Sequence, residues 1–282
     1  MDVIKANQII HGELAKTGEY DNSPHFYPEN IQAVTSLFLD FLADQKLDSS
    51  YLLSNCLDLG CGTGFMFGIL EKLGAGDLQG IDITAEMLAT CIEKYPQANV
   101  KLAKAESVPC DDHTFSMITN YSFLDHVEDV KSVFKEAYRL LSPGGVFYSG
   151  LIPNLDYSNN IKKSSNSKAL YLGSQGNMFL EKEHRSIFNN GQVYQDKFGL
   201  DAQLLRQAEP QKTNHNGLSI DKLSIFLDEA GFGKVYFCPN WFYNQAAYKK
   251  QIEKVKVIND FLIACGAFGL GMFKYYDFFA LK

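Results

Sequence analysis

Basic charge is scarce in this sequence. Its 26 lysine and arginine residues are outnumbered by 33 aspartate and glutamate residues, and the formal net charge is −7. Tight binding to nucleic acid requires clustered lysine and arginine side chains that neutralise phosphates. We therefore expect no nucleic-acid partner.

Paired cysteine motifs and long apolar runs are also absent. The six cysteines form no C-x-x-C pair and lie mostly in apolar segments, which is typical of reduced core thiols and favours a cytoplasmic protein. The longest apolar run, residues 261–273, is shorter than the roughly 20 residues that a membrane-spanning helix needs. We interpret this run as buried core and expect no membrane contact. The N-terminus shows no long apolar run either, so we expect no signal peptide.

A glycine-rich segment is the most informative feature of the chain. It reads C-L-D-L-G-C-G-T-G over residues 56–64, and the apolar residues at its start predict a buried strand. Its glycines allow the backbone to turn with no Cβ in the way, so that a ligand can approach the main chain. Asp82 ends a second short apolar strand and lies 24 residues after Asp58, about one strand-helix-strand unit. A carboxylate at that strand end can accept hydrogen bonds from both hydroxyls of a ribose, which predicts a nucleoside site.

Dinucleotide-binding proteins use a similar loop, so the kind of nucleoside has to be decided. Their fingerprint, G-x-G-x-x-G, would place its third glycine at position 65, where this sequence has Phe65. The pattern here is G-x-G-x-G, which weakens the prediction of a bound pyrophosphate. An oxidoreductase with a Rossmann fold that uses NAD(P) remains an alternative.

Further segments follow in a regular order. Apolar residues at 100–103, 115–120 and 146–148 predict three more strands, and apolar residues at helical spacing predict a helix over residues 129–141. A Pro-Gly-Gly turn separates that helix from the fifth strand. Strands that alternate with helices are typical of α/β proteins with a parallel sheet.

The ordered motifs resemble those of the class I S-adenosylmethionine-dependent methyltransferases. The matching motifs are the Asp-x-Gly-x-Gly-x-Gly loop at residues 58–64, the Asp-x-(Ser/Thr)-x-x-Met-Leu segment at 82–88, the acidic-Ala-Glu-x-x-Pro turn at 104–109 and the Leu-x-Pro-Gly-Gly turn at 141–145. The resemblance implies a Rossmann-like, mostly parallel seven-stranded α/β sheet with helices on both faces and an antiparallel last strand. It also implies S-adenosyl-L-methionine as the cofactor and a small molecule as the methyl acceptor.

The resemblance assigns roles to residues around the predicted nucleoside site. Asp82 accepts hydrogen bonds from the ribose hydroxyls, Ile83 and Met87 flank the adenine or the ribose, and the backbone of Ala105 contacts an adenine ring nitrogen. The remaining candidates in the glycine loop and at the end of the fourth strand are Asp58, Gly60, Cys61, Gly62, Gly64 and Asn120.

Three residues depart from the family pattern or extend it. Lys104 stands where the family often has an acidic residue, and a lysine cannot accept a hydrogen bond from the adenine amino group. Glu106 could replace that contact. Tyr20, within the segment Gly-Glu-Tyr-Asp, resembles a tyrosine that closes over the methionine end of the cofactor, although a tyrosine in a surface turn would give the same short match.

His126 is the candidate for a general base. Methyl transfer requires above all that a nucleophile be aligned with the methyl carbon, so a base is dispensable for some acceptors. His126 follows the fourth strand at the carboxyl edge of the sheet, where open α/β folds bind ligands. A structural role, with hydrogen bonds to nearby backbone, is the alternative. We expect no metal site and interpret the polar group Asp111, Asp112 and His113 as an exposed loop.

The segments outside the core suggest a single domain with insertions. We expect an N-terminal helical cap at residues 1–50, a methyltransferase core at 51–153 and 217–282, and an inserted substrate lid at 154–216. Disorder is the alternative for this polar insertion, although its aromatic residues favour partial order. A second insertion, with a helix near residues 244–263, precedes the last strand. A monomer and a homodimer both remain open, and a non-catalytic S-adenosylmethionine-binding protein is the second alternative to the enzyme.

Overall fold

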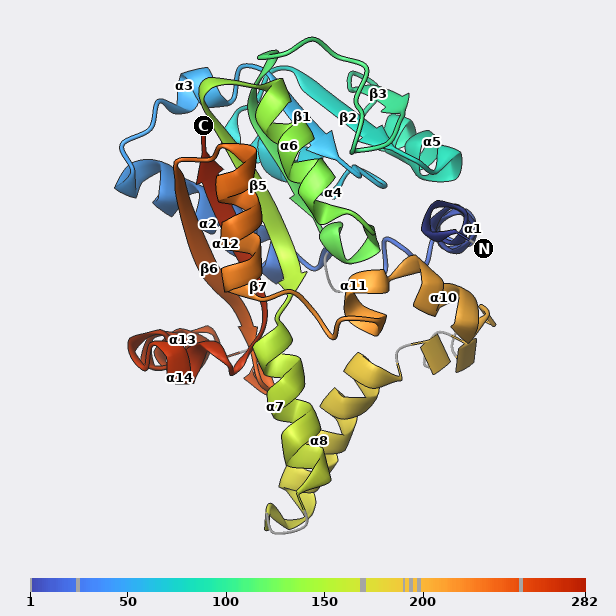
Figure 1. The fold of residues 1–282 in the computed structure, drawn as a ribbon, viewed down its shortest axis with the longest axis vertical. Coiled ribbons are helices and arrows are strands. Elements are labelled where there is room, and N and C mark those ends of the chain that lie inside the picture. The colour runs from blue at the N-terminus through green and yellow to red at the C-terminus, as the bar shows by residue number, and fades with distance from the viewer. Residues whose placement is uncertain are drawn as a thin grey trace.

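The computed structural model describes the chain at residues 2–23, 26–167, 171–189, 191–192, 195–196, 199–248 and 251–282. Its centre is a seven-stranded sheet with the strand order β3-β2-β1-β4-β5-β7-β6 (Figure 1). The strands are β1 (Cys56–Leu59), β2 (Leu78–Asp82), β3 (Asn99–Leu102), β4 (Phe115–Tyr121), β5 (Leu141–Pro153), β6 (Lys234–Phe242) and β7 (Phe273–Leu281). Neighbouring strands from β3 to β5 are parallel, and β7 is antiparallel to both β5 and β6. The predicted Rossmann-like sheet with an antiparallel last strand is confirmed.

The order of the strands changes direction at β1. The chain continues from β1 to β2 on one side and later places β4 on the other side. All residues of β1 and β4 are buried, which explains why both strands are recognisable from the sequence as largely apolar runs. In open α/β sheets, ligands bind outside the carboxyl ends of the strands at such a switch point.

Helices cover both faces of the sheet (Figure 1). One face carries α6 (Val130–Leu140) and α12 (Ile220–Ala230), in a core that includes Leu57 and Leu59 of β1. The other face carries α2 (Pro28–Asp44), α4 (Phe65–Leu73) and α5 (Ala85–Lys94), in a core that includes Cys56. Successive side chains of a strand point to opposite faces, so β1 contributes to both cores.

The N-terminal region, which the sequence predicts as a helical cap, contains α1 (Val3–Lys16), α2 and α3 (Ser49–Leu52). α1 packs against α5 and against α10 (Ala202–Ala208), a helix of the predicted insertion. The two helices α1 and α10 share a small apolar cluster that is separate from the two sheet cores: Ala6, Ile10, Leu14, Leu205 and Ala208. The cap therefore joins the insertion to the carboxyl edge of the sheet.

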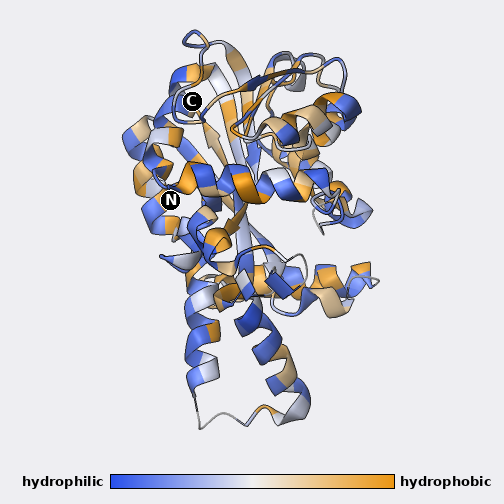
Figure 2. Ribbon diagram, turned by 90° about the vertical axis from the view of Figure 1, so that its right-hand side faces the viewer, coloured by the Kyte–Doolittle hydropathy of each residue, from blue (hydrophilic) through white to orange (hydrophobic). Residues whose placement is uncertain are grey.

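The predicted insertion at residues 154–216 is largely helical where the structure describes it. α7 (Leu155–Asn166) and α8 (Gly173–Phe188) form a hairpin that projects away from the sheet, and both helices are mostly hydrophilic in Figure 2. α10 and α11 (Pro210–Thr213) then return the chain to the sheet edge. The insertion thus has a projecting part and a part that lies near α1.

The interpretation of residues 261–273 as buried core is wrong for most of the run. α13 (Ile252–Ala264) and α14 (Ala267–Leu270) lie at the side of the molecule, beyond the end of β6 (Figure 1). The side chain of Phe261 is 66% exposed, and that of Phe268 is 94% exposed. Both sheet faces are already covered by other helices, so this apolar run has no sheet surface to pack on. Among the residues that the structure describes, no helix combines the length and the apolar character needed to cross a membrane.

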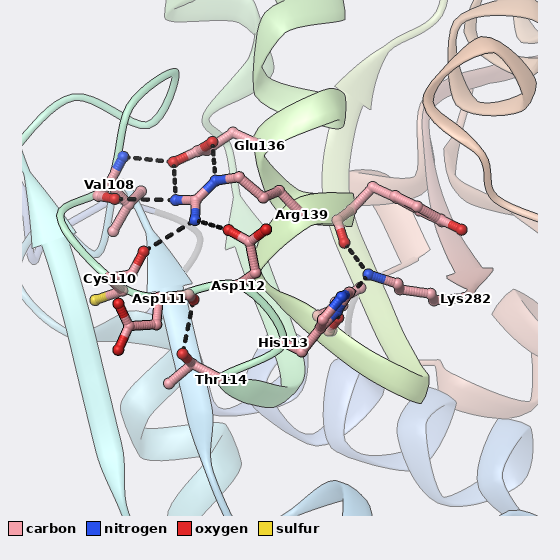
Figure 3. A network of polar contacts seen from close by, with 11 residues as sticks. Val108, Cys110, Asp111, Asp112, His113, Thr114, Glu136, Arg139 and Lys282 are labelled. Carbon is pink, nitrogen blue, oxygen red and sulfur yellow. Dashed lines mark hydrogen bonds and ion pairs between the residues drawn. The ribbon is translucent and has the colours of Figure 1, made fainter.

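The loop before β4 is exposed, as the sequence predicts, and Arg139 of α6 fixes its base (Figure 3). The guanidinium of Arg139 donates to the backbone carbonyls of Val108 and Cys110, at 3.1 and 2.9 Å. It also pairs with Asp112 at 2.5 Å and with Glu136 at 2.7 Å. These contacts hold the segment that follows residues 104–106, which contribute to the site below.

Candidate active site

A cavity of about 360 Å³ lies at the switch point of the sheet. It is lined by the loop after β1, the end of β2, residues 103–106 and parts of residues 122–129. Residues of α1, among them Val3, Asn7 and His11, complete the lining. Segments that are far apart in the sequence therefore meet in one cavity at the carboxyl edge of the sheet.

The structure brings nine of the predicted site residues to this cavity: Tyr20, Gly60, Gly62, Asp82, Ile83, Met87, Ala105, Glu106 and His126. Lys104 also lines it. The roles of these residues in binding stay predictions, but their position at one cavity is a property of the fold.

Four other candidates lie outside the cavity lining and support it from behind. Asp58 is buried and accepts a hydrogen bond from the Thr119 hydroxyl at 2.8 Å, and burial raises the pKa of this carboxyl to about 8. Cys61 packs against Gly80 of β2, where an added Cβ would lie 2.9 Å from the Sγ of Cys61. Gly64 caps α4 and has a φ of 94°. Asn120 is buried, and its side-chain oxygen accepts a hydrogen bond from the Ser149 hydroxyl at 2.6 Å.

Asp82 is held by backbone donors at the edge of the cavity. Its Oδ2 accepts from the N–H of Gly62 at 3.0 Å, and its Oδ1 accepts from the N–H of Thr84 at 2.8 Å. Burial raises the pKa of this carboxyl, and these hydrogen bonds oppose the rise. Each carboxylate oxygen has a second lone pair, so Asp82 can still accept one hydrogen bond per oxygen from a ligand.

Side chains from elsewhere in the chain pack against two glycines of the loop. Gly60 has a φ of 71°, and a Cβ there would lie 2.2 Å from the ring of Phe123. A Cβ on Gly62 would lie 3.4 Å from the Tyr20 hydroxyl. The loop that carries Tyr20 is fixed in turn, because the hydroxyl of Thr63 donates to Asp21 at 2.6 Å. Tyr20 and Phe123 therefore pack over the loop. A larger residue is excluded at Gly60 by the ring of Phe123 and is strained at Gly62 by its φ of 52°.

α1 closes the cavity through side-chain contacts with the core. The amide of Gln8 donates to the carbonyl of Ile83 at 2.9 Å. The buried amide of Asn7 donates to the carbonyls of His126 and Ala208, at 3.3 and 3.0 Å. α1 thus ties the end of β2, the turn η2 (Leu124–His126) and α10 to one another.

His126 lies in a buried polar cluster between the cavity and the insertion. Its Nδ1 is 3.1 Å from the carbonyl of Ala208 and 3.5 Å from Nε2 of His11. Because a carbonyl only accepts, the contact with Ala208 places a proton on Nδ1, and the second ring nitrogen is Nε2. That atom lies 3.6 Å from the carboxylate of Asp125. The contact with Ala208 is that of a structural histidine, and Nε2 faces the buried carboxylate of Asp125, so the catalytic role stays a prediction.

Lys212 of the insertion supplies the positive charge of this cluster. Its ammonium pairs with the carboxylate of Asp125 and lies 3.4 Å from that of Glu209. Burial alone would raise the pKa of Asp125, but the charges of His126 and Lys212 outweigh it and hold the pKa below its usual range. Among the described residues, the potential metal ligands of Asp125, His126 and Glu209 come within 4.8 Å of one another. The ammonium of Lys212 lies among these groups and pairs with both carboxylates.

The contribution of α1 and of Lys212 to the site is not anticipated from the sequence. A signal for α1 was available, because Ala6, Ile10 and Leu14 recur at intervals of four residues, as one face of a helix requires. No local pattern signals Lys212, whose partner Asp125 is distant in the chain. Long-range ion pairs of this kind are visible only in the fold.

We expect His11 to make the free energy of unfolding depend on pH. Burial lowers its pKa to about 3, with smaller contributions from His126 and Lys212, while Asp125 acts in the opposite direction. The unfolded chain binds a proton at His11 near pH 6.5, but the folded protein does not, so stability falls as the pH is lowered below that value. Between pH 7 and pH 5 we expect a loss of about 2 kcal/mol that the His11→Gln variant does not show. Urea unfolding of both proteins at the two pH values measures it, and equal losses would contradict the assignment.

Comparison with known proteins agrees with this geometry. Residues 57–149 match a protein-family model described as "Methyltransferase domain". A demethylmenaquinone methyltransferase of Chlorobaculum tepidum is 34% identical over 33% of this chain and 38% of its own length. A ubiquinone biosynthesis O-methyltransferase of Methylococcus capsulatus is 31% identical over 52% of this chain and 64% of its own length. The chain thus spans less than two thirds of either curated relative.

Solved structures show the same fold. An S-adenosylmethionine-dependent methyltransferase from Mesorhizobium loti has a TM-score of 0.50 and 16% identity, over 82% of this chain and 93% of that one. A second, from Archaeoglobus fulgidus, has a TM-score of 0.50 and 15% identity, over 89% and 94%.

The strand order defines a Rossmann-like α/β protein, and Asp82 and the glycine loop form its candidate nucleoside site. More narrowly, residues 57–149 match a methyltransferase domain, and the chain shares the fold of solved S-adenosylmethionine-dependent methyltransferases.

Proposed function

We propose that the protein transfers a methyl group from S-adenosyl-L-methionine to an oxygen, nitrogen or carbon atom of a small-molecule acceptor. The observation that carries the proposal is the position of Asp82 beside the glycine loop: its carboxylate is held by two backbone N–H groups, and Gly60 and Gly62 line the same cavity. This arrangement suits a ribose and an amino-acid end and offers no third glycine for a pyrophosphate. It therefore favours S-adenosylmethionine over NAD(P).

The residues of the cavity fit that cofactor. Asp82 would hold the ribose, Ile83 and Met87 would flank it or the adenine, Ala105 and Glu106 would contact the adenine, and Tyr20 would close over the methionine end. When bound, the cofactor supplies a methyl carbon activated by a sulfonium. The contribution of the protein is to hold both reactants in line, and good alignment can contribute roughly 7–11 kcal/mol. Phe123 and α1 exclude water from that space.

The insertion is the part of the chain that we assign to acceptor capture. Relatives named for demethylmenaquinone and for arsenite both match this chain over only about a third of its length. Because these names denote chemically different acceptors, the shared part serves the cofactor, and acceptor selection belongs to other segments. A second cavity, of about 340 Å³, lies between α8, α10 and α11 and includes Glu209 and Lys212 in its lining. A carboxylate oxygen of Glu209 also lies within 4.8 Å of a ring nitrogen of His126, which supports an acceptor that approaches from the insertion.

The net charge and the cysteines bear on the partners and the location that we propose for the protein. The acidic net charge supports an enzyme that works without nucleic acid, and all six cysteines are free thiols in the structure, which supports a cytoplasmic location. We propose that the protein is a monomer or a homodimer.

The proposal is tested by ligand-dependent thermal stability followed by label transfer. S-adenosylhomocysteine at a hundred times its dissociation constant should stabilise the protein by about 2.7 kcal/mol, and NAD⁺ should leave it unchanged. Incubation with methyl-labelled S-adenosylmethionine and a fractionated small-molecule extract should then yield a labelled product. Stabilisation by NAD⁺ instead would refute the cofactor, and binding without any labelled product would identify a non-catalytic binding protein.

A further inference from the structure

Asn7 of α1 carries a buried hydrogen-bond acceptor that no described residue satisfies. The Asn7 side chain is 3% exposed, and the residue lines the cavity at the switch point of the sheet. Its oxygen, Oδ1, is buried and has no hydrogen-bond donor among the residues that the structure describes. A buried acceptor without a donor destabilises the folded state, so a ligand in the cavity that donates to Oδ1 would remove that cost.

The orientation of the Asn7 amide is fixed by its nitrogen. Nδ2 donates to the carbonyl of Val3 at 2.9 Å, and it also donates to the carbonyls of His126 and Ala208. Carbonyls only accept, so the NH₂ group has to face them, and the amide cannot be turned over to place Oδ1 on their side. Because these contacts are made within the protein, Oδ1 is held in position before a ligand binds.

α1 presents Asn7 and His11 to the cavity from one face. The two residues are four positions apart, so they lie one helical turn from each other, and both line the cavity. A different face of α1 packs against α10 through the small apolar cluster described above. Burial lowers the pKa of His11 to about 3, so its ring is neutral at pH 7 and does not repel a cation beside Asn7.

The strand order relates Asn7 to the amino-acid end of the proposed cofactor. The proposed adenine contacts follow β3, and the proposed ribose carboxylate ends β2. Because the order is β3-β2-β1-β4, a ligand that continues along this edge reaches the glycine loop after β1 and then η2 after β4. Asn7 contacts His126 of η2, and the ring of His11 lies edge to face with that of Tyr20, at 6.0 Å between centroids. Tyr20 is the residue that we assign to the methionine end.

The charge of the cavity favours a cationic group as the missing donor. Among the described residues that line it, carboxylates outnumber ammonium groups by five to one: Asp2, Asp82, Glu106, Glu128 and Asp129 against Lys104. Such a lining attracts positive charge. In the proposed function, Asp82 takes the ribose hydroxyls, and Ala105 and Glu106 take the adenine. The donor of the cofactor that remains is the ammonium of its amino-acid end.

We propose that Oδ1 of Asn7 accepts a hydrogen bond from the ammonium group of S-adenosylmethionine. The proposal rests on the proposed function and adds a binding residue from α1 to it. Hydrogen bonds in which one group is charged are roughly twice as strong as neutral ones, so the contact contributes to affinity. The same amide donates to the carbonyl of Ala208, so Asn7 joins the bound amino-acid end to α10 of the insertion.

Calorimetric titration with two ligands tests the proposal. One ligand is S-adenosylhomocysteine, and the other is its analogue in which a hydrogen atom replaces the amino group. Asn7→Leu should bind S-adenosylhomocysteine at least about tenfold more weakly than the wild-type protein, and it should bind the analogue within a factor of about three. Asn99→Leu is the matched control, because Asn99 is exposed at the start of β3, at the edge of the sheet opposite the cavity. Its affinity for both ligands should equal that of the wild type.

Asn7→Asp provides a second comparison. This variant loses the amide donors as Asn7→Leu does but keeps an acceptor oxygen, so it should bind S-adenosylhomocysteine more tightly than Asn7→Leu. Asn7→Ala, which needs less space, gives the same comparison if Asn7→Leu does not fold. The proposal is overturned if removal of the acceptor leaves the affinity for S-adenosylhomocysteine unchanged, or if it weakens both ligands by the same factor. Equal affinities of the leucine and aspartate variants would also overturn it. A wild-type protein that does not bind S-adenosylhomocysteine would instead refute the proposed function.

Discussion

The Asp82→Ala variant should bind S-adenosylhomocysteine at least about a hundredfold more weakly than the wild-type protein. In the proposed site Asp82 accepts from both ribose hydroxyls, and each hydrogen bond to a charged group contributes about 1.5–3 kcal/mol. Loss of two such bonds is sufficient for the predicted factor. Isothermal titration calorimetry measures the dissociation constant, and the thermal shift caused by the ligand should disappear.

The fold of this variant should remain intact. The N–H groups of Gly62 and Thr84, which lose their acceptor, line the cavity together with Asp82, so water can replace the carboxylate. Asp77→Ala is the matched control, because Asp77 is an exposed carboxylate that precedes the opposite end of β2. Its affinity should stay within a factor of about two. If Asp82→Ala binds as tightly as this control, the carboxylate does not hold the ribose, and the site has been misassigned.

The sequence predicts the centre of this fold well because its elements are determined locally. The strands β1 and β4 are buried on both sides, so their residues form largely apolar runs, and the glycine loop requires positive φ angles that glycine adopts readily. Asp82 is found because it stands at the end of a strand. Each of these signals lies within a few residues of the feature that it predicts.

The sequence predicts poorly what depends on contacts between distant segments. The apolar content of residues 261–273 is the same whether the helix is covered or exposed, so it could not reveal that Phe268 faces outward. The predicted helix near residues 244–263 is divided into η3 (Gln245–Tyr248) and α13. Asp58 and Asn120 satisfy the motif positions, yet they hydrogen-bond behind the cavity wall, to Thr119 and Ser149. A residue can therefore occupy a motif position although its side chain makes contacts outside the cavity.

The Lys212→Met variant should be destabilised by about 3 kcal/mol at pH 7. Asp125 is 1% exposed, so without Lys212 its carboxylate would remain buried beside Nε2 of His126 with no ammonium to neutralise it. Removal of one partner from a buried ion pair costs about 3–5 kcal/mol, and the lower value applies because the Lys212 side chain is 26% exposed. Urea unfolding measures the free energy of unfolding.

The pH dependence of that loss distinguishes the ion pair from lost packing. In the wild-type protein, Lys212 and His126 hold the pKa of Asp125 below its usual range. Stability from this lowered pKa is present above the ordinary pKa of an aspartate and is lost as the pH falls through the lowered value. In Lys212→Met, burial acts with less opposition and raises the pKa of Asp125, so the carboxyl becomes protonated at a higher pH. The difference between the two proteins should therefore shrink as the solution is acidified.

Two comparisons complete the test of Lys212. The double variant Lys212→Met/Asp125→Asn should recover part of the lost stability, because no buried charge then lacks a partner. Lys222→Met on α12 removes an exposed lysine and should change stability by less than about 0.5 kcal/mol. A loss in Lys212→Met that is unaffected by pH and by Asp125→Asn would show that only packing of the lysine stem matters. A loss that behaves as predicted would mean that this ion pair couples the stability of the insertion to the turn that carries His126.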